Sequence, residues 1–108
     1  MFLLILLSLL SLLSVFMVIA RRYLVSGDVQ GVGFRYYVLR EAERIGNLRG
    51  FVRNLRDGSV EAYAEGEEII LAQLEESLRR GPRYSVVSHL NVLEETPQGN
   101  SIDFRITF

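Results

Sequence analysis

The stretch Ser26–Val38, SGDVQGVGFRYYV, places three glycines just before an arginine. Glycines between a strand and a helix N-terminus let successive backbone N–H groups converge on one point, where the helix dipole also favours an anion. Arg35 falls in the first turn of the expected helix, where a cation is disfavoured by about 0.3–1 kcal/mol. An anion held between the amides and the guanidinium would offset that cost. The alternative interpretation is a glycine-rich turn followed by a solvated arginine.

Asn54 is the second residue that could take part in chemistry, because it stands at the end of an expected strand, just before a tight turn. Its amide carries both a hydrogen-bond donor and an acceptor and could hold a water molecule. Asparagine is also a common turn residue, so a structural role is the alternative. A fold that brings the glycine-rich loop and this turn to one end of a sheet would bring the two candidates to the same region.

The composition excludes several kinds of site. The chain has no cysteine, which removes disulfides, thiolate nucleophiles and thiolate metal ligands, and its single histidine, His89, excludes a multi-histidine metal site. The net charge of −1 gives no indication of nucleic-acid binding. The loop also lacks the GxxxxGK[ST] pattern of nucleotide-binding P-loops. Catalysis must therefore use arginine, carboxylates, hydroxyls, amides or the backbone.

The elements that would position these residues follow a β-α-β-β-α-β order with a short fifth strand. The hydrophobic spacing and turn residues predict strands and helices over the following segments: strand 19–27, helix 34–46, two strands within 48–66, helix 67–80, and strands within 84–95 and 101–108. Within the second of the paired strands, apolar Val60, Ala62 and Ala64 alternate with Glu61, Tyr63 and Glu65, which predicts a half-buried strand. This order predicts an α+β, ferredoxin-like split β-α-β fold, with two helices on one face of an antiparallel sheet.

The first twenty residues differ from the rest of the chain, since seventeen are apolar, three are serine and none is charged. As a helix they would reach about 30 Å, enough to span a bilayer. They could also be a signal peptide ending near Ala20, or the recorded start could be too early, with Met17 opening the first strand. We therefore divide the chain into an apolar segment, 1–16, and a domain, 17–108.

Two separated motifs resemble a known family. The sequences GDVQGVGFR (27–35) and GFVRNLRDG (50–58) occur in the order and at the spacing found in the acylphosphatases. The resemblance runs from about Ile19 to Phe108. Asp28 departs from it, because many relatives carry a basic residue there, and Phe51 replaces a frequent tryptophan. The apolar residues 1–16 are not a family feature.

The resemblance implies hydrolysis of a carboxylic–phosphoric anhydride to a carboxylate and inorganic phosphate, without a metal or another cofactor. Arg35 matches the family's phosphate-binding arginine, and Asn54 matches its water-orienting asparagine. The matching backbone cradle consists of Gln30, Gly31, Val32, Gly33 and Phe34. The expected partner is a small-molecule acyl phosphate.

Other interpretations remain beside this one. The chain could be a noncatalytic anion-binding module within a complex. It also resembles the domain that opens the large hydrogenase-maturation carbamoyltransferases, but that interpretation predicts downstream zinc-binding cysteines, which this chain lacks. We expect a monomer that binds no nucleic acid, with membrane contact only through the apolar segment. We also expect a cytoplasmic location, with an anchored or exported protein as the alternative.

Overall fold

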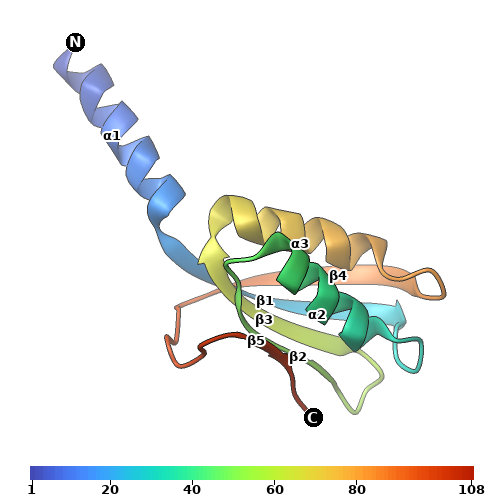
Figure 1. Ribbon diagram of the computed structural model, residues 1–108. Coiled ribbons are helices and arrows are strands. Elements are labelled where there is room, and N and C mark those ends of the chain that lie inside the picture. Colours follow the sequence, from blue (N-terminus) through green and yellow to red (C-terminus); the bar gives the residue numbers. More distant parts are fainter.

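A five-stranded sheet carries two helices on one face, and a third helix extends away from it at the N-terminus (Figure 1). The computed structural model describes the backbone of residues 1–108 and the side chains of residues 1–9 and 17–108. The elements follow in the order α1 (Phe2–Phe16), β1 (Val18–Asp28), α2 (Phe34–Ile45), β2 (Arg49–Asn54), β3 (Val60–Glu67), α3 (Glu68–Arg80), β4 (Val86–Glu95) and β5 (Phe104–Ile106).

The strands lie in the order β4-β1-β3-β2-β5. β1 is antiparallel to both β3 and β4, and β2 is antiparallel to β3. The predicted fold class is thereby confirmed, with the difference that β5 runs parallel to β2. The reason is that β4 ends at the same end of the sheet where β2 begins. Residues 96–103 cross from one edge of the sheet to the other at that end, so β5 starts beside the start of β2.

The helices α2 and α3 are held on the sheet by apolar side chains at helical spacing. Phe34, Val38 and Ala42 of α2 are buried, as are the leucines of α3 at positions 71, 74 and 78. Each large apolar side chain buried in this way contributes about 1.5–3 kcal/mol to stability. Both helices end at a glycine with positive φ, as the sequence predicts, and the first turn of α2 lies at the same end of the sheet as the end of β1 (Figure 1).

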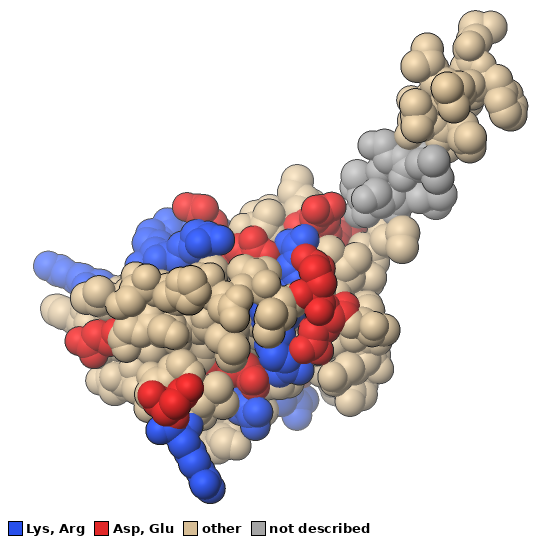
Figure 2. All heavy atoms as spheres, turned by 180° about the vertical axis from the view of Figure 1, so that it is seen from behind, with Lys and Arg blue, Asp and Glu red and all other residues tan. Residues whose placement is uncertain are grey.

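The prediction that β3 is half-buried is wrong, because the strand is buried on both faces from Val60 to Gly66. Paired charges cover the face away from the helices. Glu61 accepts a hydrogen bond from Arg53 at 2.7 Å and forms an ion pair with Arg22 at 3.2 Å. Basic and acidic side chains are interleaved on this rear face (Figure 2). The polar positions of the alternating pattern are therefore buried by partners from other strands and from the connection between β4 and β5.

Glu65 is the most heavily bonded carboxylate on this face. Its Oε2 accepts hydrogen bonds from the Tyr63 hydroxyl at 2.6 Å and from the backbone N–H groups of Gln98 and Gly99 at 2.6 and 3.0 Å. Burial alone would raise the pKa of Glu65, but these hydrogen bonds outweigh it and hold the pKa below the usual 4.5.

We expect Glu65→Gln to cost about 1–3 kcal/mol of unfolding free energy at pH 7, because it removes charge-assisted hydrogen bonds from a buried site. Since the folded-state pKa of Glu65 is lowered, its stabilisation is present above pH 4.5 and is lost as the pH falls through the folded-state pKa. Urea unfolding at pH 7 and in acid should therefore show the difference between wild type and variant shrinking in acid. Glu76→Gln, on the exposed face of α3, is the control. A difference that stays constant with pH would contradict this account.

The apolar N-terminal segment forms α1, and the described side chains of residues 1–9 are exposed. α1 ends at Phe16 and β1 begins at Val18, so the expected boundary between residues 16 and 17 falls between two elements. None of the helices described here combines the length and the apolar character that a membrane span requires.

Candidate active site

The glycine-rich loop turns directly into α2. Gly31 and Gly33 have φ values of 75° and 78°, in the left-handed region that favours glycine, and Gly33 is the N-cap residue. An added Cβ at either position would meet no described atom within 4 Å, so backbone conformation rather than crowding favours glycine. On the other side, Phe34 is buried and Val32 packs against the core. The loop is thus fixed from beneath and open above.

The first turn of α2 leaves backbone donors available. The first intrahelical hydrogen bond runs from the Tyr37 N–H to the Gly33 carbonyl at 3.0 Å, so the N–H groups of residues 33–36 precede the helical ladder. No described side chain caps this end. These donors and the positive end of the helix dipole are the groups from which an anion-binding cradle can be built.

A side chain of the loop fastens it to the hairpin between β2 and β3. Gln30 Nε2 donates to the Leu55 carbonyl at 2.7 Å and to the Ser59 carbonyl at 2.8 Å. Two segments about 25 residues apart are thereby held together at one end of the sheet. The approach of the loop and the hairpin, which the sequence could only suggest, is present in the structure.

Asn54 is the last residue of β2, and it is half-buried opposite Val60 of β3. The turn that follows is stabilised by Asp57, whose Oδ1 accepts hydrogen bonds from the Ser59 N–H at 2.9 Å and from its hydroxyl at 2.5 Å. The Ser59 hydroxyl, followed by its N–H, lowers the pKa of Asp57. Asp57 therefore supports the turn, and Asn54 lies at the strand end that Gln30 ties to the loop.

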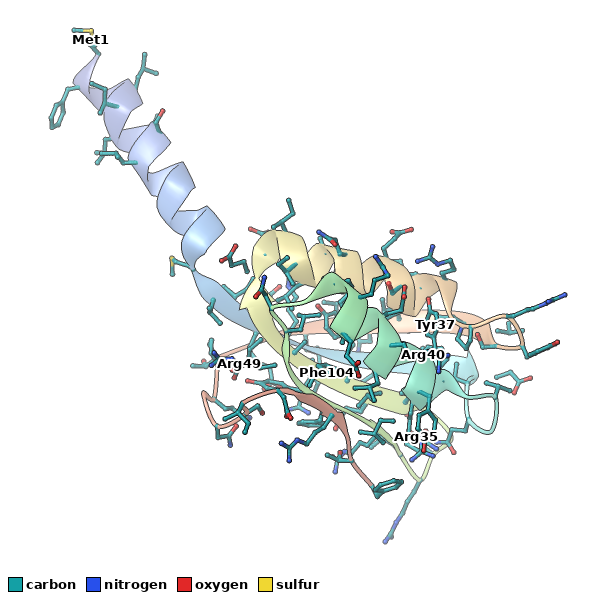
Figure 3. The ribbon with its side chains drawn as sticks, in the orientation of Figure 1. Met1, Arg35, Tyr37, Arg40, Arg49 and Phe104 are labelled. Carbon is teal, nitrogen blue, oxygen red and sulfur yellow. The ribbon has the colours of Figure 1, made fainter. Side chains whose placement is uncertain are left out.

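Arg35 projects from the start of α2 (Figure 3), and its side chain is half-buried. None of the ion pairs between described residues involves Arg35, so its charge is not committed to a carboxylate. Its guanidinium carbon lies 5.2 Å from the centroid of the Phe108 ring, a cation–π distance. The Thr107 N–H donates to the Val52 carbonyl at 2.9 Å, which holds the C-terminal residues beside β2.

Other residues whose side chains could take part in catalysis are placed differently. His89 is exposed on β4, and the Tyr37 hydroxyl donates to the Ser77 carbonyl at 2.7 Å, which joins α2 to α3. Over the part of the chain whose side chains are described, no three carboxylate or imidazole groups are grouped as a metal site requires.

Comparison with known proteins identifies the family. The family model described as Acylphosphatase matches residues 21–106. The chain belongs to the acylphosphatase family. The match includes both the glycine-rich loop with Arg35 and the hairpin with Asn54, and members of this family are enzymes.

Individual acylphosphatases agree with this assignment. An acylphosphatase of Koribacter versatilis is 48% identical over 86 residues, which cover 80% of this chain and 77% of the relative. The crystal structure of acylphosphatase from Bacillus subtilis superposes with a TM-score of 0.79 at 39% identity, covering 85% of this chain and all of the other. The superposition therefore leaves out only a small part of this chain.

The same fold also occurs inside a longer protein. HypF from T. kodakarensis superposes with a TM-score of 0.70 at 36% identity, but the match covers 83% of this chain and only 12% of HypF. The fold of this chain therefore corresponds to most or all of the acylphosphatases above, but to only one section of HypF.

Two contacts at the candidate site have no signal in the sequence. The bridging role of the Gln30 side chain and the position of Phe108 over Arg35 both join segments that are distant in the chain. A cleft of about 740 Å³ is not part of the candidate site, because it lies at the opposite end of the sheet, where β1 and β2 begin. Arg49 and Phe104 mark that end, and Arg35 the other (Figure 3).

Proposed function

We propose that this chain hydrolyses acyl phosphates to a carboxylate and inorganic phosphate without a metal ion. In this proposal the phosphoryl group is held by the backbone of residues 30–34 and by the Arg35 guanidinium. Asn54 orients the attacking water molecule. Family membership and fold support acyl phosphate hydrolysis, and the proposed roles of Arg35, Asn54 and the loop backbone follow the resemblance of the two motifs to those of the family.

The pair of hydrogen bonds from Gln30 to the hairpin carries the proposal. They hold the open loop at the N-terminus of α2 against the hairpin that follows Asn54. An anion bound at the loop would meet backbone donors, an unpaired guanidinium and, from the hairpin side, an amide with both donor and acceptor. Such an arrangement can bind a phosphoryl group and position a nucleophile beside it.

The reaction needs no stronger catalyst than these groups provide. The conjugate acid of a carboxylate leaving group has a pKa of about 4, so the group departs without a general acid. Phosphoryl transfer depends chiefly on positioning and on charge stabilisation, which the amides and Arg35 supply. Asparagine is not a strong base at neutral pH, so the proton of the water passes to a phosphoryl oxygen in this mechanism.

The proposal places the activity in residues 17–108. The proposal gives residues 1–16 no role in the reaction, since α1 extends from the opposite end of the sheet (Figure 1). We take a cytoplasmic monomer as the working form.

The direct test is turnover of benzoyl phosphate by the full chain, with and without a chelator. We expect saturable hydrolysis at an unchanged rate in the presence of the chelator, with inorganic phosphate as a competitive inhibitor. Phosphate binding without turnover would favour a noncatalytic anion-binding module instead. A rate abolished by the chelator and restored by a divalent metal would overturn the metal-free mechanism.

A further inference from the structure

A second cationic site lies between α2 and the end of α3, and none of its lining residues belongs to the proposed phosphoryl site. The hollow has a volume of about 580 Å³. Four arginines line it, two from α2 and two from the end of α3 and the following loop: Arg40, Arg44, Arg80 and Arg83. Arg40 and Tyr37 extend from α2 beside the end of α3 (Figure 3).

The hollow carries an excess of positive charge. Glu41 is the one carboxylate in its lining, and it pairs with Arg44 at 3.0 Å and with Arg80 at 3.7 Å. The hydrogen bond from Arg44, against a smaller effect of burial, lowers the pKa of Glu41, which is therefore ionised at neutral pH. Four guanidinium groups against one carboxylate leave three positive charges, in a chain whose net charge is −1.

Two of the four arginines are not committed elsewhere. Arg40 and Arg83 enter none of the ion pairs found between described residues. Both are exposed, and Arg83 stacks only on the neighbouring Tyr84, with its guanidinium carbon 5.7 Å from the ring centroid. Their N–H donors are free to bind an anion.

The end of α3 would ordinarily oppose an anion, because the C-terminus of a helix carries partial negative charge. Here the Ser77 carbonyl already accepts hydrogen bonds from the Tyr37 hydroxyl at 2.7 Å and from the Gly81 N–H at 3.0 Å. The Ser77 hydroxyl also donates to Glu41 at 2.8 Å. These bonds occupy the Ser77 carbonyl and fix the single carboxylate. The remaining partial negative charge of the helix end, about half an elementary charge, is smaller than the excess positive charge of the four arginines.

The chemistry of the lining indicates the ligand. All twelve cationic side chains of the chain are arginine, whose planar guanidinium binds phosphate in a bidentate manner. The volume lies within the range of about 300–1,000 Å³ that small-molecule sites occupy, and it exceeds what one phosphate needs. We propose that this arginine hollow binds a small molecule with several linked phosphate groups, at a site separate from Arg35.

Calorimetric titration of the full chain with inorganic tripolyphosphate tests this proposal. The Arg35→Gln protein should still bind one tripolyphosphate per chain, because Arg40 follows Arg35 by about 140° around α2 and serves the other side of the helix. The Arg40→Gln/Arg83→Gln double variant should bind at least tenfold more weakly, and it should hydrolyse acyl phosphate as the wild type does. Arg79→Gln, which removes an exposed arginine of α3 outside the lining, should change the affinity less than twofold.

Three results would overturn the inference. The first is the absence of saturable binding in the Arg35→Gln protein, which would place any tripolyphosphate at the phosphoryl site. The second is an affinity that the double variant leaves unchanged. The third is an equal loss in Arg79→Gln, which would show attraction to surface charge in general.

Discussion

Arg35→Gln should lower kcat/KM for benzoyl phosphate by about 10²–10³, the largest effect expected of any single substitution in this chain. Glutamine keeps much of the length of the side chain but removes the charge that would face the phosphoryl oxygens. The affinity for inorganic phosphate should fall together with the rate, because the same guanidinium would bind ground state and transition state. Steady-state kinetics and phosphate inhibition constants measure both quantities.

Two further variants separate charge from geometry at this position. Arg35→Lys keeps the charge but loses the planar fork, so its rate should lie between those of the wild type and Arg35→Gln. Arg79→Gln removes an exposed arginine of α3 that enters none of the ion pairs found between described residues, and it should leave the rate unchanged. Wild-type turnover in Arg35→Gln would exclude Arg35 from the mechanism.

Asn54→Ala should lower kcat by about a hundredfold while the inhibition constant for inorganic phosphate changes less than twofold. The proposed task of Asn54 is to orient water, which affects the rate but not the binding of the phosphoryl group. The separation of the two measurements distinguishes this role from that of Arg35.

The control for Asn54 is Asn91→Ala, which truncates an exposed asparagine of β4 and should have no effect on either quantity. A parallel loss of phosphate affinity and turnover in Asn54→Ala would instead indicate that Asn54 shapes the hairpin. Thermal unfolding of each variant then shows whether the hairpin is still formed.

The elements were predictable because each carries its signal locally. The spacing of Phe34, Val38 and Ala42 defines α2, and the glycines at positions 46 and 81 end the two helices on the sheet. The turn at Asp57 and Gly58 gave the hairpin and so placed Asn54 at a strand end. These features depend on neighbours within a few residues, which a sequence displays directly.

The features that the sequence did not predict depend on contacts between segments that are distant in the chain. The alternation in β3 suggested one solvated face, but Arg22 and the residues around Gln98 cover it, from positions about 35–40 residues away. The parallel direction of β5 depends on where residues 96–103 cross the sheet. At the site, the Gln30 bridge and the Arg35–Phe108 contact belong to the same class. Such contacts are set by the completed packing and leave no periodicity in the sequence.

The position of Phe108 has a practical consequence for handling this protein. Its side chain is 94% exposed, its ring centroid lies 5.2 Å from the Arg35 guanidinium carbon, and the preceding residue is hydrogen-bonded to β2. An affinity tag or a fused reporter attached after Phe108 would therefore begin at the proposed phosphoryl site and compete with the substrate for space. The same addition before Met1 would lie beyond the far end of α1 (Figure 3). Fusions made at the N-terminus should therefore report the activity of the unmodified site.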